Sequence, residues 1–207
     1  MKSLSKPVRI FIIIILFAVI YVPVGLLWEK VLPLYSEILA SLSEGIINAI
    51  EFSDTSYIIT VDRGDFKVDA RVAIGSGYSR SRFQLSGTRP ADLVTYNLSL
   101  WAAFFLASFA FQDRSARWRF LLISPVILVL WHICDLTIFA KNTRWILVRD
   151  LSEQYPSLIG YSLSWHWFWM WVLEFNRRII DPFLPLLLWF VFCFRSFFAR
   201  PSTDTPN

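Results

Sequence analysis

The feature that most constrains this chain is an uncharged apolar run close to its N-terminus. Residues 10–28 read IFIIIILFAVIYVPVGLLW and contain no formally charged side chain. A helix of about 20 apolar residues is long enough to cross the hydrocarbon core of a bilayer. The run is long for the apolar part of a signal peptide, and no small-residue cleavage site follows it. We therefore predict an uncleaved first membrane span.

Three more apolar runs follow in a chain that is 56% hydrophobic and 17% aromatic. They are predicted as spans at residues 93–112, 120–140 and 179–200. The loop DRSARWR (113–119) joins the first two of them into a helical hairpin. Along the second span the small residues Ser99, Ala103 and Ala107 recur at every fourth position. This spacing places them on one helix face, against which another helix can pack closely.

The positions of the basic residues give the predicted orientation. They flank the apolar runs at the N-terminus, in the loop 113–119, and at Arg195 and Arg200. In a four-span arrangement all of these lie on one side, so the positive-inside rule predicts that both termini are cytoplasmic. The net charge of +4 is dispersed between apolar runs instead of forming one stripe. It therefore does not indicate nucleic-acid binding.

The segment between the first two spans is predicted to form a small extracytoplasmic α/β insert. Apolar residues recur at helical spacing over 34–52, directly after Pro33. The sequence then alternates with a period of two, which indicates strands joined at the hairpin-type turn RGD (63–65). We predict an antiparallel sheet, with one face covered by the preceding helix or by lipid, from strands at 57–62, 66–73 and 78–85.

The predicted fold class is therefore an α-helical membrane protein with about four transmembrane helices and an extracytoplasmic α/β insert between helices 1 and 2. The predicted segments, in chain order, are a cytoplasmic N-terminus with the first span (1–28), the insert (29–91) and the hairpin (92–140). An extracytoplasmic loop with an aromatic helix (141–178), the last span (179–200) and a tail (201–207) follow.

A basic patch is predicted near the start of the second span. It consists of Arg80, Arg82 and Arg89. Such a patch can dock an acidic partner or lipid head groups, or it can be a solvated strand face. The sequence favours the solvated face.

The most aromatic segment is SWHWFWMW (164–171). Trp165, Trp167, Trp169 and Trp171 alternate here with His166 and other residues. Tryptophan prefers the boundary between water and lipid, which favours an interfacial helix within 157–175, or an aromatic overhang of the last span, on the outer face. A fifth span is the alternative, and it would place Arg195 and Arg200 outside.

A polar cluster is predicted at membrane depth. His132 and Asp135 are three residues apart in the third span, so they share a helix face. A carboxylate within a membrane is costly unless it is paired, and Glu174, Arg177, Arg178 and Asp181 are predicted at a similar level. We expect an ion pair from Asp135 to Arg177 or Arg178 that fixes helix packing; a catalytic or transport role is the alternative.

Chemical alternatives rest on the two histidines and on Cys134. His132 and His166 are possible axial ligands of a b-type haem, and Cys134 with His166 and an arginine is a possible cysteine transpeptidase constellation. Neither pattern has a surrounding signature, and no zinc spacing or glycine-rich phosphate loop is present. We therefore predict no catalytic residue, metal or cofactor. A membrane redox or catalytic protein using His132, Asp135 and His166 is the rival class.

Three short stretches carry a resemblance to a known family. They are YNLSLWAAFFLAS entering the second span, LWHICDLTIFAK in the third, and DPFLPLLLWF opening the last. With the layout of the spans, the chain resembles the small exosortase H-associated membrane proteins of Gram-negative bacteria. The resemblance implies a non-enzymatic accessory protein of the bacterial inner membrane, in a sorting system whose exosortase cleaves the C-terminal anchor of exported proteins. The implied partners are the lipid bilayer and another membrane protein, either the exosortase or a sorted substrate.

Overall fold

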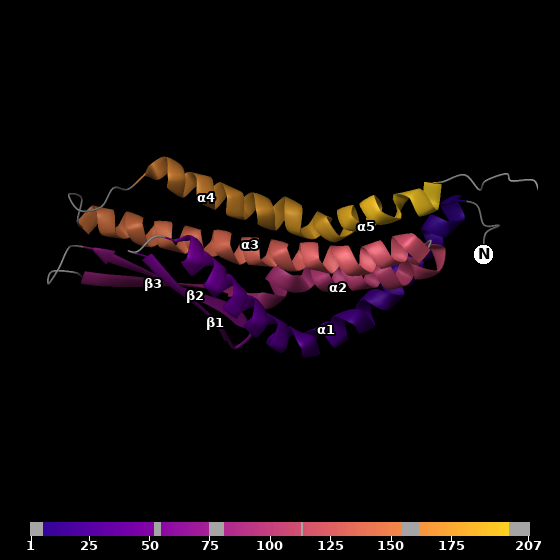
Figure 1. Cartoon of the computed structure of the whole chain (residues 1–207), viewed down its shortest axis with the longest axis horizontal. Helices are drawn as coiled ribbons and strands as arrows, with labels where there is room; N and C mark the ends of the chain where they lie inside the picture. The colour runs from indigo at the N-terminus through magenta and orange to yellow at the C-terminus, as the bar shows by residue number, and fades with distance from the viewer. Residues whose placement is uncertain (1–5, 52–54, 75–80, 113, 155–161, 199–207) are drawn as a thin grey trace, which may run out of the picture. The chain divides into compact units, whose positions relative to one another are not determined.

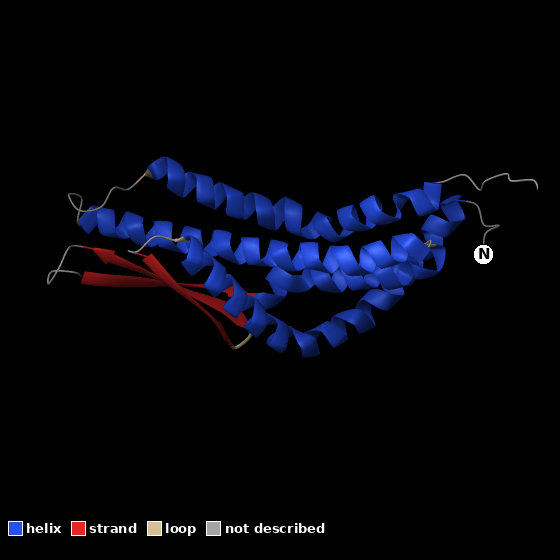
Figure 2. Ribbon diagram, viewed as in Figure 1, coloured by secondary structure: helices blue, strands red, loops and turns tan. Residues whose placement is uncertain are grey.

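The computed structural model describes residues 6–51, 55–74, 81–112, 114–154 and 162–198. Figures 1 and 2 show the helices and strands within these ranges. Along the chain the elements are α1 (Lys6–Ile50), β1 (Thr55–Asp62), β2 (Asp65–Ile74), β3 (Ser81–Pro90), α2 (Ala91–Ser108), the 3₁₀ turn η2 (Phe109–Phe111), α3 (Arg114–Gln154), α4 (Leu163–Phe175), the π-helical turn η3 (Asn176–Ile180) and α5 (Asp181–Phe198).

Two compact units divide these elements. The bundle unit combines residues 1–28, 97–128 and 183–207, and the sheet unit combines residues 29–96 and 129–182. Each long helix therefore contributes one part of its length to each unit.

Three helical segments in the described part of the chain are long and apolar enough to cross a membrane. They are Pro7–Ile50, Ala91–Phe111 and Arg114–Gln154. With the three-stranded antiparallel sheet between α1 and α2, this confirms the coarse part of the predicted fold, which is long apolar helices with a small sheet inserted between the first two. A crossing at 179–200 stays a prediction.

The predicted helix boundaries were wrong in two places, and in both the helix is longer than predicted. A break was expected between the span 10–28 and the helix 34–52, but α1 is continuous from Lys6 to Ile50. Helix was likewise not expected over 113–119 or beyond residue 140, whereas α3 runs from Arg114 to Gln154. Charged residues mark where a helix leaves apolar surroundings, but lysine, arginine and glutamate are good helix formers and do not end it.

The sheet follows the predicted alternation. Its strand order is β1-β2-β3, with pairs such as Tyr57↔Ala70 and Val68↔Gly87. The predicted turn at RGD (63–65) is present and is formed by two residues, Arg63 and Gly64, whose positive φ angles of 52° and 88° are what a type I′ hairpin requires. The third strand lies later than predicted, at Ser81–Pro90, and residues 78–80 lie outside the described residues. Pro90 is tolerated because it ends an edge strand.

One face of the sheet forms the core of the sheet unit. Its buried side chains pack with buried residues of α1, α2 and α3. Full burial of one large apolar side chain contributes about 1.5–3 kcal/mol. The sheet contributes Tyr57, Ile59, Phe66, Val68 and Ala70, and the helices contribute Leu39, Ala40, Ile47, Ala91, Val94, Ile133, Leu136 and Ala140. The covered face is therefore packed against helices of the same unit.

The bundle unit is held by small residues and stacked rings. Ser99, Ala103 and Ala107 are all buried along α2. Next to them, the ring of Phe104 lies 4.3 Å from that of Phe17 in α1. Burial of these small side chains is what a close helix contact on that face requires.

Candidate functional site

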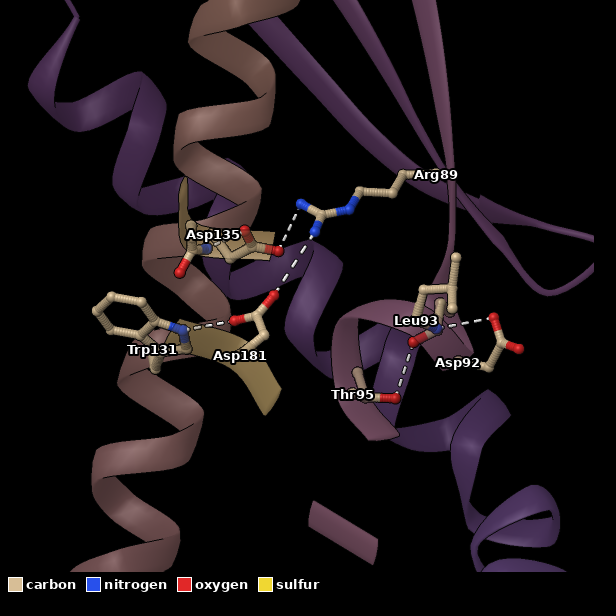
Figure 3. A network of polar contacts seen from close by, with 9 residues as sticks. Arg89, Asp92, Leu93, Thr95, Trp131, Asp135 and Asp181 are labelled. Carbon is tan, nitrogen blue, oxygen red and sulfur yellow. Dashed lines mark hydrogen bonds and ion pairs between the residues drawn. The ribbon is translucent and has the colours of Figure 1, made fainter. Parts of the chain in front are cut away.

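A buried polar network joins β3, α3, η3 and α5 (Figure 3). At its centre the guanidinium of Arg89 faces two carboxylates. Its Nη1 lies 2.5 Å from Oδ2 of Asp135, and its Nη2 lies 3.8 Å from Oδ2 of Asp181. Arg89 is 8% exposed and each aspartate only 1%. All three residues belong to the sheet unit.

Neutral donors complete the network. The side-chain amide of Asn176 donates to Oδ1 of Asp135. The indole N–H of Trp131 donates to Oδ1 of Asp181 over 2.7 Å, as Figure 3 shows. We call Arg89, Trp131, Asp135, Asn176 and Asp181 the Arg89 network. Each carboxylate thus faces both the shared cation and one uncharged donor.

The charges of the Arg89 network do not balance if both aspartates are ionised. Two carboxylates and one guanidinium would leave a net charge of −1 where almost no water is in contact. Burial of an uncompensated charge costs several kcal/mol, so a buried carboxyl instead takes up a proton. Asp135 has the closer ion pair, so Asp181 is the carboxyl expected to be neutral.

The position of Arg89 in the chain indicates the level of this network relative to the candidate span in α2. Arg89 lies two residues before Ala91, where that span begins. Because Asp135 and Arg89 are in contact, Asp135 lies at the same end of α2. The strand that leads into α2 can therefore supply the partner of this buried carboxylate.

The close ion pair of Asp135 is made with Arg89 and not with Arg177 or Arg178 as predicted, although the charge of Arg177 still acts on Asp135 from a longer distance. Arg178 instead donates from Nε to Oε2 of Glu174 over 2.7 Å, in an exposed i,i+4 pair. Arg177 is exposed and lines a cavity described below. The partner of Asp135 comes from the sheet, which spacing along the helices alone could not reveal.

The predicted basic patch is not assembled in the described residues either. Arg82 and Arg89 are an odd number of positions apart on one strand, so they lie on opposite faces of the sheet. Arg82 is exposed, whereas Arg89 is buried, so the solvated-face prediction was wrong for Arg89. Arg80 lies outside the described residues.

His132 lies on the buried face of α3 together with Asp135, as their spacing predicts. Its ring is fully buried, and Nδ1 lies 2.6 Å from the hydroxyl oxygen of Tyr35 in α1. Cys134, between them in sequence, is exposed. The histidine and the cysteine therefore face different surroundings.

His166 lies in a different part of the sheet unit. It is 5% exposed on α4, and burial lowers its pKa, with a further lowering from the nearby Arg149 guanidinium and an opposing effect of Asp150. Arg149 follows His132 on α3 by 17 residues, which is about 26 Å along a helix. The two histidines are therefore not placed to ligate one haem, and Cys134 is not placed beside His166.

Tryptophan residues of α4 precede and follow this buried histidine in the sequence, and the ring of Trp167 contacts it edge-on. Trp165, Trp167 and Trp171 are 53%, 59% and 62% exposed, and Trp169 is half-buried. An exposed tryptophan surface is typical of a helix at the boundary between lipid and water.

A cavity of about 140 Å³ lies at the end of β3. Its lining comes from β3, α2, α3 and the α4–η3 junction. The lining residues are Thr88, Arg89, Pro90, Leu93, Phe139, Leu173, Glu174 and Arg177. It therefore combines an apolar wall with the exposed guanidinium of Arg177.

A second ion-pair group ties the end of α1 to α3. Glu51 pairs with Lys141 and, over 3.3 Å between Oε1 and Nη1, with Arg144. This group and the roles of Tyr35, Trp131 and Asn176 were missed from the sequence. Asp181 was expected near the level of Asp135, and it does share Arg89 with it. The described residues contain no group of three histidine, cysteine or acidic side chains suited to a metal ion.

Comparison with models of protein families, with curated proteins and with solved structures finds no match to this chain.

Proposed function

We propose that this protein is a non-enzymatic accessory subunit of a membrane complex, and that the sheet unit is the part offered to its partner. The Arg89 network carries the proposal. Its charged groups, which are costly to bury, are directed at one another and join β3 to α3 and α5. In this arrangement they hold a sheet in place on membrane helices, which is a structural role.

The outer face of the sheet supports the same role. Its side chains alternate with the buried ones and include charged residues on each strand. Examples are Asp62, Lys67, Asp69, Arg71 and Arg82. A polar sheet face fixed beside membrane helices suits contact with a water-exposed part of another membrane protein.

The resemblance to the exosortase H-associated membrane proteins supplies the finer proposal. We place the protein in the bacterial inner membrane with both termini in the cytoplasm and the sheet outside. The partner is then an exosortase-type peptidase or one of the exported proteins that it processes.

The experiment is recovery of the complex from native membranes. An affinity-tagged chain at its natural level is cross-linked in the membrane, purified in mild detergent and analysed by mass spectrometry. We expect an exosortase-type peptidase in the purified fraction, and deletion of the chain should impair C-terminal processing of exported proteins. The proposal is contradicted if the chain is cross-linked to no other protein and processing is normal in the deletion strain. A Soret band in the purified protein also contradicts it, because that band would show bound haem.

A further inference from the structure

The two edges of the sheet are treated differently by the rest of the chain. At the β1 edge, the amide of Tyr57 donates to Oδ1 of Asn48, and Nδ2 of Asn48 donates back to the carbonyl of Tyr57, each over 2.8 Å. The amide of Ile59 donates to Oε2 of Glu44, also over 2.8 Å. Side chains of α1 thus occupy the main-chain groups with which another strand would pair.

The β3 edge has the same main-chain groups without such partners in the described residues. In an antiparallel pair, successive residues alternate between facing the neighbouring strand and facing away. Because Tyr57 faces away from β2, the register places the outward groups of β3 at every second residue. These outward positions are Arg82, Gln84, Ser86 and Thr88, and all four residues are exposed.

This edge is long and regular. β3 pairs with β2 without interruption from Ser81 to Pro90. Apart from the ladder to β2, no backbone hydrogen bond from another described segment reaches residues 82–88. An edge of this length without such partners among the described residues is a template for a further strand.

The cavity lies at the end of the same edge. Thr88, the last outward position, lines it together with Leu93, Phe139 and Leu173. Arg177 lines it too; its charge acts on Asp135 from a distance, but it makes no close ion pair with another described residue, whereas Glu174 is paired with Arg178. An apolar wall with one available guanidinium suits a side chain that has an aliphatic stem and a terminal carboxylate.

We propose that an extended segment of the partner polypeptide adds to the sheet beside β3 as a fourth strand and places a glutamate in the cavity against Arg177. The main-chain bonds to Gln84 and Ser86 hold the segment, and the cavity sets its register. This inference rests on the proposed function, because it states how the partner of the accessory subunit is bound.

The first experiment removes outward donors from β3 without touching the ladder to β2. Gln84→Pro and Ser86→Pro each delete one outward N–H, and the matched controls Gln84→Ala and Ser86→Ala keep it. We expect the proline variants to recover the partner at least about tenfold less well than the wild type, which is about 1.4 kcal/mol. The alanine variants should behave as the wild type, and circular dichroism should show an intact fold for all four.

The outcomes separate the two proposals. If the wild type recovers the partner and both folded proline variants recover it equally, the edge is not the binding site. If the wild type recovers no partner, the proposed function fails. The second experiment then decides the edge by itself.

The second experiment uses a peptide tethered to the full-length protein. A ten-residue peptide of alternating threonine and valine with one glutamate is disulfide-linked to Ser81→Cys in a background with Cys134→Ser and Cys193→Ser. A short tether gives an effective concentration in the millimolar range, so weak pairing is detected. We expect amide hydrogen exchange over 81–90 to slow at least about tenfold, which corresponds to about 1.4 kcal/mol. A peptide N-methylated at its β3-facing positions should have no effect.

The proposal is overturned if amide hydrogen exchange over residues 81–90 is the same with the unmodified peptide and with the N-methylated peptide. Protection of 81–90 that depends on protein concentration, together with a doubled particle mass in the absence of peptide, also overturns it. In that case the edge is occupied by a second copy of the chain. In a parallel binding measurement, Arg177→Gln should weaken the binding of a peptide that contains glutamate but not the binding of the same peptide with glutamine in its place.

Discussion

At the residue scale, the unequal distances from Arg89 to its two carboxylates suggest unequal roles. Asp135 lies at 2.5 Å and also accepts a hydrogen bond from Asn176, while Asp181 lies at 3.8 Å. If Asp181 already carries a proton, an amide in its place changes no charge. The two aspartates can therefore be distinguished by the same chemical substitution.

We predict that Asp181→Asn changes the free energy of unfolding by less than about 1 kcal/mol, because it only mimics a neutral carboxyl. Asp135→Asn should lower it by about 2 kcal/mol or more, because it removes the close partner of a buried cation. The measurement is thermal unfolding of each variant in the same detergent. Equal losses for the two variants would show that the carboxylates share the charge evenly.

Arg89 itself gives a prediction that depends on pH. Arg89→Met leaves two buried carboxyls without a cation, so both must hold protons in the folded variant. We predict a loss of about 3–5 kcal/mol at neutral pH. The folded variant binds more protons than its unfolded state, so its stability falls as pH rises and is partly restored at low pH. Wild-type and variant unfolding curves at several pH values test this; a loss that is independent of pH would contradict it.

Two glycines provide a matched pair at the same scale. A Cβ on Gly87 would lie 2.8 Å from Oγ1 of Thr143 and 3.1 Å from the ring of Phe139, while one on Gly45 would meet nothing within 4 Å. We predict that Gly87→Ala costs about 1–3 kcal/mol. Gly45→Ala should stabilise α1 by about 0.5–1 kcal/mol. Unfolding measurements check both, and Thr143→Ala should recover part of the Gly87→Ala loss.

At the scale of elements, the bonds from α1 to β1 are the clearest protective device of the sheet. We predict that Asn48→Ala lowers the free energy of unfolding by about 1–3 kcal/mol, because the amide and carbonyl of Tyr57 lose their partners. The variant should also self-associate, because the β1 edge becomes available for pairing. Thermal unfolding and size-exclusion chromatography at increasing concentration measure the two effects.

Glu44 supplies the control for that prediction. Glu44→Gln keeps an acceptor for the amide of Ile59 and should resemble the wild type, whereas Glu44→Ala should behave as a milder form of Asn48→Ala. Self-association of the glutamine variant would show that charge, and not occupation of the edge, prevents pairing.

The elements also show which parts of the fold could be predicted from the sequence. The strands near 57–62 and 66–73 and the turn at Arg63–Gly64 followed from local alternation and from glycine, which are properties of neighbouring residues. The ends of α1 and α3 did not, because charges leave no local sign that a helix continues.

The partner of Asp135 was out of reach for a different reason. Arg89 is distant in sequence from Asp135, and only the register of β3 and its packing on α3 bring them together. The need for a partner followed from the cost of a buried carboxylate, but its identity depends on tertiary structure. The same holds for Tyr35 at His132.

At the scale of the whole molecule, helix length constrains the topology. α1 has 45 residues and α3 has 41, which correspond to about 68 Å and 62 Å at 1.5 Å per residue. A hydrocarbon core of about 30 Å takes up only half of each. Each helix, if it crosses, must therefore extend well beyond the bilayer. In the sequence the sheet lies between the polar half of α1 and the start of α2. It therefore lies on the side of the bilayer to which the polar half of α1 extends.

Cysteine accessibility tests this topology in a background with Cys134→Ser and Cys193→Ser. Thr60→Cys on β1 and Arg178→Cys on η3 are both at exposed positions and should react with an impermeant reagent in intact cells. Ser115→Cys, at the arginine-flanked start of α3, and Ser202→Cys should react only after lysis, because basic flanks stay cytoplasmic. Outside labelling of Ser202 with cytoplasmic Arg178 would instead make the aromatic segment a fifth span. That result would carry His166 into the bilayer.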